Sequence, residues 1–350
     1  MSIDPIFMER ALQLAKNGLG VTAPNPMVGA VIVQGNRIIG EGYTSAYGGP
    51  HAEVNAINSV TDKSLLSKST LYVTLEPCSH YGKTPPCADL IVKHKIPNVV
   101  IGTVDPHDKV KGKGVARLKE SGCNVTVGIL EDACREHHKR FMTFHQKQRP
   151  YIILKWAETK DGFMAPLASK RNGKTEPYWI SNHYSRQLVH KWRSEEQAIL
   201  VGTNTVTEDN PKLNVREWFG KSPIRVILDR NLRIQGEYHI FDQKVKTIIF
   251  TQIEDTAQWK KGVDYEVVDF SVNLPEQICQ VLYKHNITSV LIEGGSQTLT
   301  SFISADLWDE TRIFNGPNTF EKGLKAPKIM GKNPCFLNID TDILNIYRND

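Results

Sequence analysis

The sequence predicts an α/β protein with two domains. Its 350 residues exceed the length of one typical domain. Short apolar runs of strand character alternate with helical segments through both halves of the chain, and this alternation is typical of α/β sheets. A polar segment from Lys147 to Pro150 separates the halves, so we place the domains at residues 1–147 and 148–350.

The first half opens with a helix. Apolar residues recur at helical spacing from Pro5 to Asn17, and Gly18 ends the pattern. His51 and Cys87 each stand where a later helical pattern begins, and one further helix is expected over residues 132–146. The expected strands of this half cover residues 30–33, 37–41, 70–75, 99–104 and 125–127.

The second half repeats the alternation. Its expected strands cover residues 151–156, 198–201, 224–228, 247–250, 289–292 and 311–314. No Gly-x-Gly-x-x-Gly follows the first of them, so the Rossmann fingerprint is absent. Instead, Gly294-Gly295 precedes a helix expected over 297–303. This turn either lets backbone amides approach a phosphate or is a simple tight turn. The polar residues 166–177 are expected to form an exposed loop.

The composition is that of a globular protein without a membrane span. Apolar residues make up 40% and charged residues 23% of the chain. The net charge of +5 suits small anionic substrates and is weak support for nucleic acid, which usually requires a concentrated basic face. Six scattered cysteines do not form a disulfide scaffold, and reduced thiols indicate a cytoplasmic enzyme. Neither a secretory signal nor an apolar run near about 18 residues is present.

The first domain is organised around His51, Glu53, Cys78 and Cys87. One imidazole and two thiols are the ligand set of a zinc site that keeps an open position. His-x-Glu followed by Pro-Cys and a second Cys is the signature of zinc-dependent deaminases, although eight residues separate the cysteines here instead of the usual two. Glu53 is the expected shuttle for protons between a zinc-bound water and a leaving amine.

Other interpretations of these residues stand beside the catalytic zinc site. The two cysteines could be buried thiols, or the zinc could be structural. His80 is a rival ligand, because Cys78 and His80 could reach the same ion. Since His51 and Cys87 both begin helices, a metal would lie between two helix N-termini, where the dipoles favour thiolate.

Asn25 is a candidate substrate-binding residue. It lies between Pro24 and Pro26, which fix the backbone around it. A rigid asparagine can present both a donor and an acceptor to the edge of a heterocycle. An ordinary turn residue is an equally good interpretation of the same position.

Several motifs together resemble one family. They are Pro-Asn-Pro-x-Val-Gly from Pro24, His-Ala-Glu from His51, Glu-Pro-Cys-Ser-His-x-Gly-x-Thr-Pro-Pro-Cys from Glu76, and Lys155 followed by Asp161-Gly162. With these motifs in this order, nearly the whole chain resembles the bifunctional riboflavin-biosynthesis deaminase-reductases. The resemblance implies a cytidine-deaminase-like three-layer α/β/α domain followed by a dihydrofolate-reductase-like α/β domain.

The resemblance also implies two reactions and two cofactors. One zinc ion per chain, on His51, Cys78 and Cys87, would support hydrolytic removal of the 2-amino group from 2,5-diamino-6-(5-phosphoribosylamino)pyrimidin-4-one. NADPH would then reduce the ribosyl side chain of the resulting uracil to ribityl. The expected partner is therefore a small phosphorylated pyrimidine, with no nucleic acid and no membrane.

The resemblance assigns residues of the second half to both ligands. Family positions that contact the substrate match Arg193, Leu213, Arg216 and Glu293. Positions that contact the cofactor match Glu158, Trp179, Thr205, Asp209, Arg230, Gly295, Ser296, Gln297, Thr298, Leu299, Thr300 and Ser301. The two substrate-side arginines suit a phosphate monoester, because a guanidinium makes bidentate contacts.

The sequence departs from the family pattern in four places. Pro177 stands where a substrate-binding serine is expected, and the segment 166–177 is longer than usual. Glu158 replaces a small residue near the nicotinamide. Arg230 replaces a small polar residue near the phosphates of the cofactor, where it could favour the 2′-phosphate of NADPH. We therefore expect NADPH as the cofactor and leave the detail of these contacts open.

Two other functions fit parts of the sequence. A nucleic-acid base deaminase with an appended RNA-binding domain would share the zinc motif, but the second half shows no aromatic and basic motif for stacking bases. A zinc-stabilised binding protein would leave Glu53 and Asn25 without a purpose. The oligomeric state stays open, a homo-oligomer included.

Overall fold

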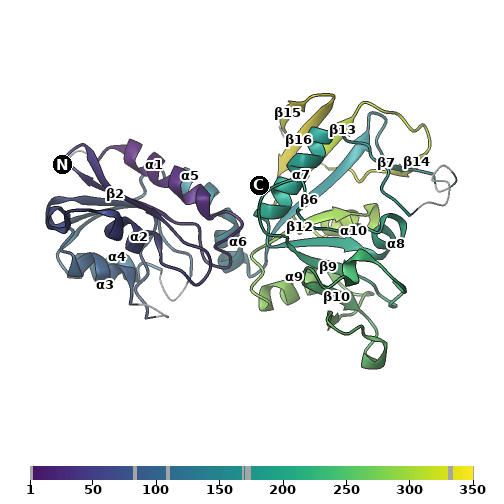
Figure 1. Cartoon of the computed structure of the whole chain (residues 1–350), viewed down its shortest axis with the longest axis horizontal. Coiled ribbons are helices and arrows are strands. Elements are labelled where there is room, and N and C mark those ends of the chain that lie inside the picture. Colours follow the sequence, from purple (N-terminus) through teal and green to yellow (C-terminus); the bar gives the residue numbers. More distant parts are fainter. Residues whose placement is uncertain are drawn as a thin grey trace. The chain divides into compact units, whose positions relative to one another are not determined.

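The computed structural model describes residues 3–81, 85–107, 111–167, 169, 175–329 and 334–349. The chain divides into two compact units, Met1–Gln148 and Arg149–Asp350 (Figure 1). The division falls one residue beyond the boundary placed after residue 147. Residues 168 and 170–174 of the predicted loop at 166–177 lie outside the described residues.

Five strands form the sheet of the first unit: β1 (Gly29–Gln34), β2 (Arg37–Tyr43), β3 (Thr70–Leu75), β4 (Asn98–Thr103) and β5 (Asn124–Val127). Their order is β2-β1-β3-β4-β5. β1 runs antiparallel to β2 and β3, whereas β3, β4 and β5 are parallel to one another. The parallel part of the sheet therefore directs the ends of β3 and β4 to the same edge.

Helices cover both faces of this sheet. They are α1 (Pro5–Ala15), α2 (Ala52–Ser59), α3 (Cys87–Lys93), α4 (Lys113–Glu120), α5 (Glu131–His137) and α6 (Lys139–Lys147). Strand residues alternate between the faces. Ile32 and Val73 pack in one cluster with α2, α3 and α4, whereas Val31 and Val100 pack in another with α1 and α5. The first unit is the expected three-layer α/β/α arrangement (Figure 1).

Two helices stand where the periodicity of the sequence predicts one. The expected helix over 132–146 is interrupted, because α5 ends at His137 and α6 begins at Lys139. His138, between them, is buried, and its Nε2 lies 3.1 Å from Oγ1 of Thr74 in β3. The interruption falls on a side chain bound to the sheet, a tertiary contact that local periodicity does not record.

Nine strands form the main sheet of the second unit: β6 (Tyr151–Thr159), β8 (Ala198–Gly202), β9 (Ile224–Leu228), β10 (Thr247–Thr251), β11 (Asp264–Val267), β12 (Ser289–Gly294), β13 (Glu310–Gly316), β15 (Cys335–Ile339) and β16 (Asp342–Arg348). Their order is β11-β10-β9-β8-β12-β6-β13-β16-β15. Neighbouring strands from β11 to β13 in this order are parallel. Beyond β13, β16 pairs antiparallel with β13, and β15 pairs antiparallel with β16. A separate antiparallel pair joins β7 (Phe163–Pro166) to β14 (Gly323–Lys325).

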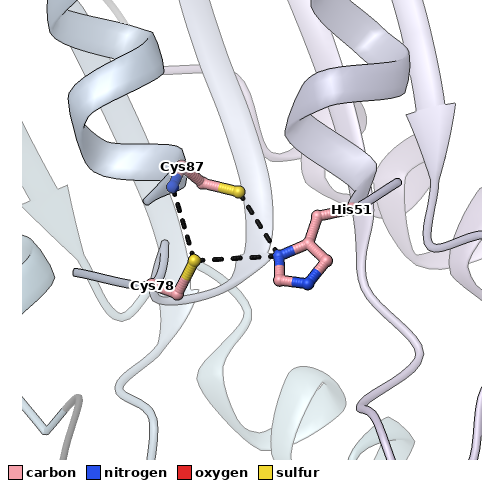
Figure 2. A group of neighbouring side chains, drawn as sticks. All are labelled: His51, Cys78 and Cys87. Carbon is pink, nitrogen blue, oxygen red and sulfur yellow. Dashed lines mark hydrogen bonds between the residues drawn. The ribbon is translucent and has the colours of Figure 1, made fainter. Parts of the chain in front are cut away.

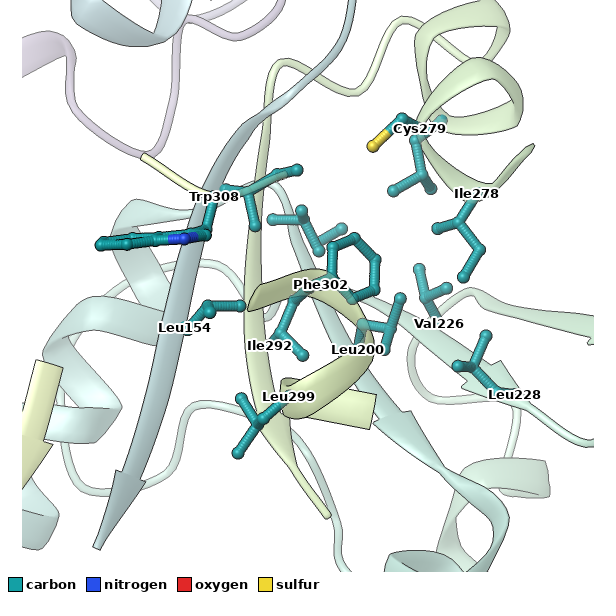
Figure 3. Packing of buried hydrophobic residues seen from close by; sticks show 14 of the residues in the cluster. Leu154, Leu200, Val226, Leu228, Ile278, Cys279, Ile292, Leu299, Phe302 and Trp308 are labelled. Carbon is teal, nitrogen blue, oxygen red and sulfur yellow. The ribbon is translucent and has the colours of Figure 1, made fainter. Parts of the chain in front are cut away.

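The sheet of the second unit is also covered on both faces. Its helices are α7 (His183–Glu195), α8 (Thr203–Asp209), α9 (Leu274–Lys284) and α10 (Ser296–Ser304). Leu154 of β6 packs with Phe302 of α10 in one cluster (Figure 3). Ile153 of the same strand packs with Trp192 of α7 in another cluster. Burial on both faces explains why these strands read as continuous apolar runs.

The described residues also form short 3₁₀ helices: η1 (Lys16–Gly18), η2 (Lys63–Lys68), η4 (His239–Phe241) and η5 (Thr256–Gln258).

Because β8, β9 and β12 are parallel, their carboxyl ends meet at one edge of the sheet. No helix among the described residues is long and apolar enough to cross a membrane.

A buried ion pair fixes the start of the second unit. The Arg149 guanidinium donates to the Asp309 carboxylate at 2.5 and 2.8 Å, and the Ile152 N–H donates to it at 2.9 Å. We expect Asp309→Ala to lower the free energy of unfolding by about 3–5 kcal/mol, because the Arg149 charge stays buried without this partner. Urea denaturation followed by tryptophan fluorescence measures it, since all six tryptophans lie between residues 156 and 308.

An exposed ion pair of the same unit supplies the control. Lys246 and Asp264 lie 2.9 Å apart with side chains 51% and 53% exposed. Asp264→Ala should change the free energy of unfolding by less than about 1 kcal/mol. If both variants lost the same free energy of unfolding, burial would not explain the contribution of the Arg149–Asp309 pair to stability.

Candidate active sites

Three potential metal ligands from separate segments meet in the first unit. His51 directly precedes α2, Cys87 is the first residue of α3, and Cys78 lies in the loop after β3. His51 Nδ1 lies 3.7 Å from Cys78 Sγ and 3.4 Å from Cys87 Sγ (Figure 2). The ligand atoms of all three residues lie within 4.8 Å of one another. The structure therefore brings together the three residues that the motif indicates.

The spacing of these atoms fits a tetrahedral zinc ion. Zn–S bonds of about 2.3 Å and Zn–N bonds of about 2.0 Å at a tetrahedral angle place nitrogen and sulfur ~3.5 Å apart. The observed separations of 3.7 and 3.4 Å lie on either side of that value. Three protein ligands leave one position for water, as in catalytic zinc sites. Among the described residues, no fourth His, Cys, Asp or Glu joins the group.

The carboxylate of Glu76 holds the loop that carries Cys78. Glu76 is buried and accepts hydrogen bonds from three backbone N–H groups, those of Asp105 at 3.2 Å, Gly112 at 3.0 Å and Val115 at 3.0 Å. A carboxylate at the N-terminus of α4 is also stabilised by the positive end of the helix dipole. Gly114 permits the contact, because a Cβ there would lie 2.1 Å from the Pro77 carbonyl oxygen. The position of Cys78 thus depends on α4.

Hydrogen bonds set the charge of the three ligands. The bond from Cys87, followed by the bond to His51, lowers the pKa of the Cys78 thiol. The backbone N–H of Cys87 also donates to Cys78 Sγ at 3.3 Å. The same contact with Cys78, together with burial, raises the pKa of Cys87. The hydrogen bond with Cys78 raises the pKa of His51 to about 9. Cys78 is therefore held as a thiolate, the form that binds zinc.

Glu53 lies in the first turn of α2 and is 3% exposed. Burial, and then the nearby charge of Cys78, raises the pKa of this carboxyl to about 7. A group with such a pKa both accepts and releases protons near neutrality. A zinc ion beside it would lower the pKa, because positive charge favours the carboxylate.

His80 and Asn25 lie outside the metal group. His80 is exposed, and its ring is not among the ligand atoms that lie together. Residues 82–84 of the same motif fall outside the described residues. Asn25 is half-buried in the loop before β1, where its backbone N–H donates to the Thr22 carbonyl at 3.0 Å. That loop is tied down by His137, whose Nε2 lies 2.8 Å from the Met27 carbonyl oxygen.

A cavity of about 1350 Å³ lies at the carboxyl ends of β8, β9 and β12 in the second unit. Open α/β sheets bind their ligands at this edge. The lining includes the four substrate residues predicted in the second half, Arg193, Leu213, Arg216 and Glu293. It also includes most of the predicted cofactor residues, namely Trp179, Thr205, Asp209, Arg230, Gly295, Ser296, Gln297, Thr298 and Ser301.

Three predicted cofactor residues are not among those that line the cavity. The Leu299 side chain is fully buried in the core cluster and does not line the cavity (Figure 3). Thr300 is exposed on α10. The Glu158 carboxylate accepts hydrogen bonds from Trp156 Nε1 at 2.8 Å and Asn315 Nδ2 at 2.7 Å.

The Gly294-Gly295 turn has a conformation that favours glycine. Gly294, with a φ of +138°, ends β12 where a Cβ would be strained. Gly295 directly precedes α10, and both glycines line the cavity. The N–H groups at the start of α10 could meet a phosphate, and this conformation fits both interpretations of the turn.

Arg193 and Glu293 form a bidentate ion pair in the wall of the cavity. Arg193 Nε and Nη2 donate to the two Glu293 oxygens at 2.8 and 2.7 Å. Lys155 Nζ lies 3.9 Å from the same carboxylate. Burial favours the neutral acid, but the charges of Arg193 and Lys155 overcome it and lower the pKa of Glu293 to about 2. Much of the hydrogen-bonding capacity of Arg193 is thus used within the protein.

Arg216 is the more available of the two predicted phosphate ligands. Its side chain is 37% exposed, and its nearest acid is Glu217, with Nε 3.6 Å from Oε1. On the cofactor side, Arg230 Nε donates to Gln252 Oε1 at 2.9 Å. Leu213, by contrast, is buried in a core cluster.

Sequence reasoning gave no role to Lys155 or Glu76. Lys155 lies within the apolar run that opens strand β6, and burial lowers its pKa. A charge within a buried apolar run is the signal that could have indicated a role for it. Glu76 directly precedes Pro77 and Cys78, but its hydrogen-bond partners lie 29 to 39 residues further along the chain. The sequence around Glu76 therefore does not indicate its role.

Comparison with known proteins finds relatives of both units. Residues 1–103 match the family model of the cytidine and deoxycytidylate deaminase zinc-binding region, and residues 150–333 match that of the RibD C-terminal domain. The riboflavin biosynthesis protein RibD of Aquifex aeolicus is 40% identical over 92% of this chain and 89% of that protein. RibD of Synechocystis is 36% identical over 95% and 89%.

Two solved structures share the fold over almost the whole chain. The diaminohydroxyphosphoribosylaminopyrimidine deaminase/5-amino-6-(5-phosphoribosylamino)uracil reductase of Thermotoga maritima is 39% identical, with a TM-score of 0.87 over 99% of this chain and 98% of that one. RibD of Acinetobacter baumannii is 32% identical, with a TM-score of 0.86 over 98% of each chain. These relatives confirm the predicted two-domain α/β class and the resemblance drawn from the motifs.

The ligand set makes the zinc content of variants predictable. We expect about one zinc per chain in the purified protein and its loss in Cys87→Ser, because a serine hydroxyl does not replace a thiolate ligand. Elemental analysis measures this. Cys123→Ser is the matched control, since Cys123 donates to the Ile96 carbonyl at 3.4 Å and lies outside the group. Full zinc in Cys87→Ser would place another residue, such as His80, in the ligand set.

Proposed function

Since this chain belongs to the RibD family of riboflavin biosynthesis, which unites a zinc-dependent deaminase with an NADPH-dependent reductase, we propose that it deaminates a phosphorylated diaminopyrimidine and then reduces its ribosyl chain. The substrate is 2,5-diamino-6-(5-phosphoribosylamino)pyrimidin-4-one, and the intermediate is 5-amino-6-(5-phosphoribosylamino)uracil. The observation that carries the proposal is the zinc-fitting group of His51, Cys78 and Cys87 beside the buried Glu53.

Glu53 moves the protons of the deamination. Zinc held by His51, Cys78 and Cys87 would supply the Lewis acidity that lowers the pKa of water to about 7. Glu53 takes one proton from the attacking water and delivers it to the ring nitrogen, then takes the second from the added hydroxyl and delivers it to the leaving amine. Oxygen replaces the amino group, which departs as ammonia. Asn25 holds the edge of the heterocycle through its amide donor and acceptor.

The cavity of the second unit holds the reductase reactants. NADPH bound there supplies the hydride. Trp179, Thr205, Asp209, Arg230 and the start of α10 hold the cofactor, whereas Arg216, assisted by Arg193, holds the substrate phosphate. Since the ribose C1 must lie close to the nicotinamide, the phosphate contact fixes position as well as affinity.

A nucleic-acid base deaminase with an RNA-binding domain is not favoured. Its second half would require a surface for stacking bases, whereas residues 150–333 match the RibD C-terminal domain. The cytoplasmic location and a homo-oligomer stay predictions.

Product analysis tests the two reactions. The protein incubated with the diaminopyrimidine alone should yield ammonia and the uracil intermediate, and addition of NADPH should yield the ribityl product, both identified by mass. Unchanged substrate in the presence of a full zinc complement would contradict the deaminase assignment.

The role of Glu53 predicts the behaviour of Glu53→Gln. Glutamine keeps the size and hydrogen bonding of the side chain but cannot shuttle a proton, so zinc should stay bound while deamination slows about 10²–10⁴-fold. Steady-state ammonia release measures the rate. Glu131→Gln is the matched control, an exposed glutamate in the first turn of α5. Near-normal turnover in Glu53→Gln would make Glu53 a structural group.

The role of Arg216 predicts a loss confined to one reactant. Arg216→Ala should raise KM for the uracil intermediate roughly tenfold or more and lower kcat/KM, because a charged hydrogen bond to the phosphate is removed. KM for NADPH should stay nearly unchanged. Arg230→Ala, on the cofactor side, should show the reverse selectivity. A loss confined to NADPH in Arg216→Ala would refute the assignment.

A further inference from the structure

The segment of residues 213–220, which carries Arg216, is docked along α7. Gly220 makes a close approach, because a Cβ there would lie 2.6 Å from Ser194 Cβ, and its φ of +137° favours glycine. Nearby, Lys191 Nζ lies 5.8 Å from the centre of the Trp218 ring. The segment contains no strand or helix. Its backbone is not held in a hydrogen-bonded ladder. Contacts with α7 position it, together with the buried Leu213 side chain and a hydrogen bond from the Val215 N–H to Ser222 Oγ at 3.1 Å.

Two side chains of α7 bind the peptide groups on either side of Val215. Arg193 Nη1 donates to the Asn214 carbonyl at 3.4 Å, and the Arg216 backbone N–H donates to His190 Nδ1 at 3.4 Å. Residues 190 and 193 are three apart and lie on one face of the helix. Arg193 is itself held by Glu293. The helix thus fixes the backbone from which the Arg216 side chain extends into the cavity.

The environment of His190 keeps its ring neutral and defines its tautomer. The residue is 2% exposed, and burial, with the charges of Arg193 and Arg216, lowers its pKa to about 4. A neutral ring that accepts at Nδ1 carries its proton on Nε2. Nε2 lies 3.6 Å from Glu217 Oε1, and Glu217 lies 3.6 Å from Arg216 Nε. The ring therefore contacts both the backbone of Arg216 and the side chain of the next residue.

We propose that His190 is a positioning residue for substrate phosphate, acting by holding the backbone of Arg216 so that the guanidinium faces the bound intermediate. The inference rests on the proposed role of Arg216 in binding that phosphate. His190 is not among the residues that line the cavity, so its effect on the substrate passes through Arg216.

Three substitutions separate positioning from packing. His190→Asn keeps an acceptor close to the place of Nδ1, His190→Gln places its amide nearer to Nε2, and His190→Leu keeps only apolar volume. His190→Leu and His190→Gln should raise KM for the uracil intermediate about fivefold, the size of one net hydrogen bond. His190→Asn should restore most of the affinity. The dissociation constant for NADPH, from fluorescence titration, should stay unchanged in all three.

A double-mutant cycle decides whether the effect passes through Arg216. In an Arg216→Ala background, His190→Leu should add little to KM, because the side chain that it positions is gone. Equal losses in both backgrounds, or a weaker NADPH complex, would overturn the positioning role and assign His190 to packing. If His190→Leu does not fold, the contrast between His190→Asn and His190→Gln decides, and equal KM values in those two overturn the proposal.

The same cycle separates this inference from the proposed function. An unchanged KM in Arg216→Ala alone would refute phosphate binding by Arg216, and the positioning role with it. A raised KM in Arg216→Ala with a normal KM in His190→Leu would leave the function intact and overturn only the role of His190. An intermediate without the phosphate should be insensitive to both substitutions, and a response of His190→Leu with that compound would also overturn the proposal.

Discussion

Burial of both faces of the two sheets is the constraint on which the rest of the structure depends. Parallel strands covered by helices on each side leave no exposed face for polar chemistry. Polar and charged side chains must therefore gather where strands end and helices begin. Cys78 follows β3, and His51 and Cys87 stand at the starts of α2 and α3. In the second unit the cavity lies at the ends of β8, β9 and β12.

The two sites handle buried charge by different means. In the first unit the Cys78 thiolate lies against the His51 ring, and Glu53 is buried beside them with a raised pKa, so the group is prepared for a divalent cation. In the second unit Arg193 and Glu293 neutralise each other in a bidentate ion pair, and Lys155 lies close to the same carboxylate. The first arrangement suits metal binding and proton transfer. The second gives a rigid wall with charges in fixed directions, against which a phosphorylated substrate can be held.

Two residues expected to depart from the family pattern have partners of their own in this chain. Glu158 accepts hydrogen bonds from Trp156 and Asn315, so its carboxylate is satisfied within the protein. Arg230 Nε donates to the neutral amide oxygen of Gln252, and Arg230 lines the cavity, where its charge can meet an anion.

The alternation of strands and helices, the two units and the ligand types of the metal group can all be predicted from the sequence, because periodicity and motif spacing are local properties. Which atoms meet depends on the packing of the folded chain. It placed His51 within 3.7 Å of both cysteines, turned Leu299 into the core, interrupted a helix at His138, and gave Glu76 and His190 their partners. Those outcomes depend on contacts between residues that are remote in the chain, such as Glu76 with Val115 and His190 with Arg216. Such contacts exist only after the sheets and helices have packed, so no pattern within a single segment records them.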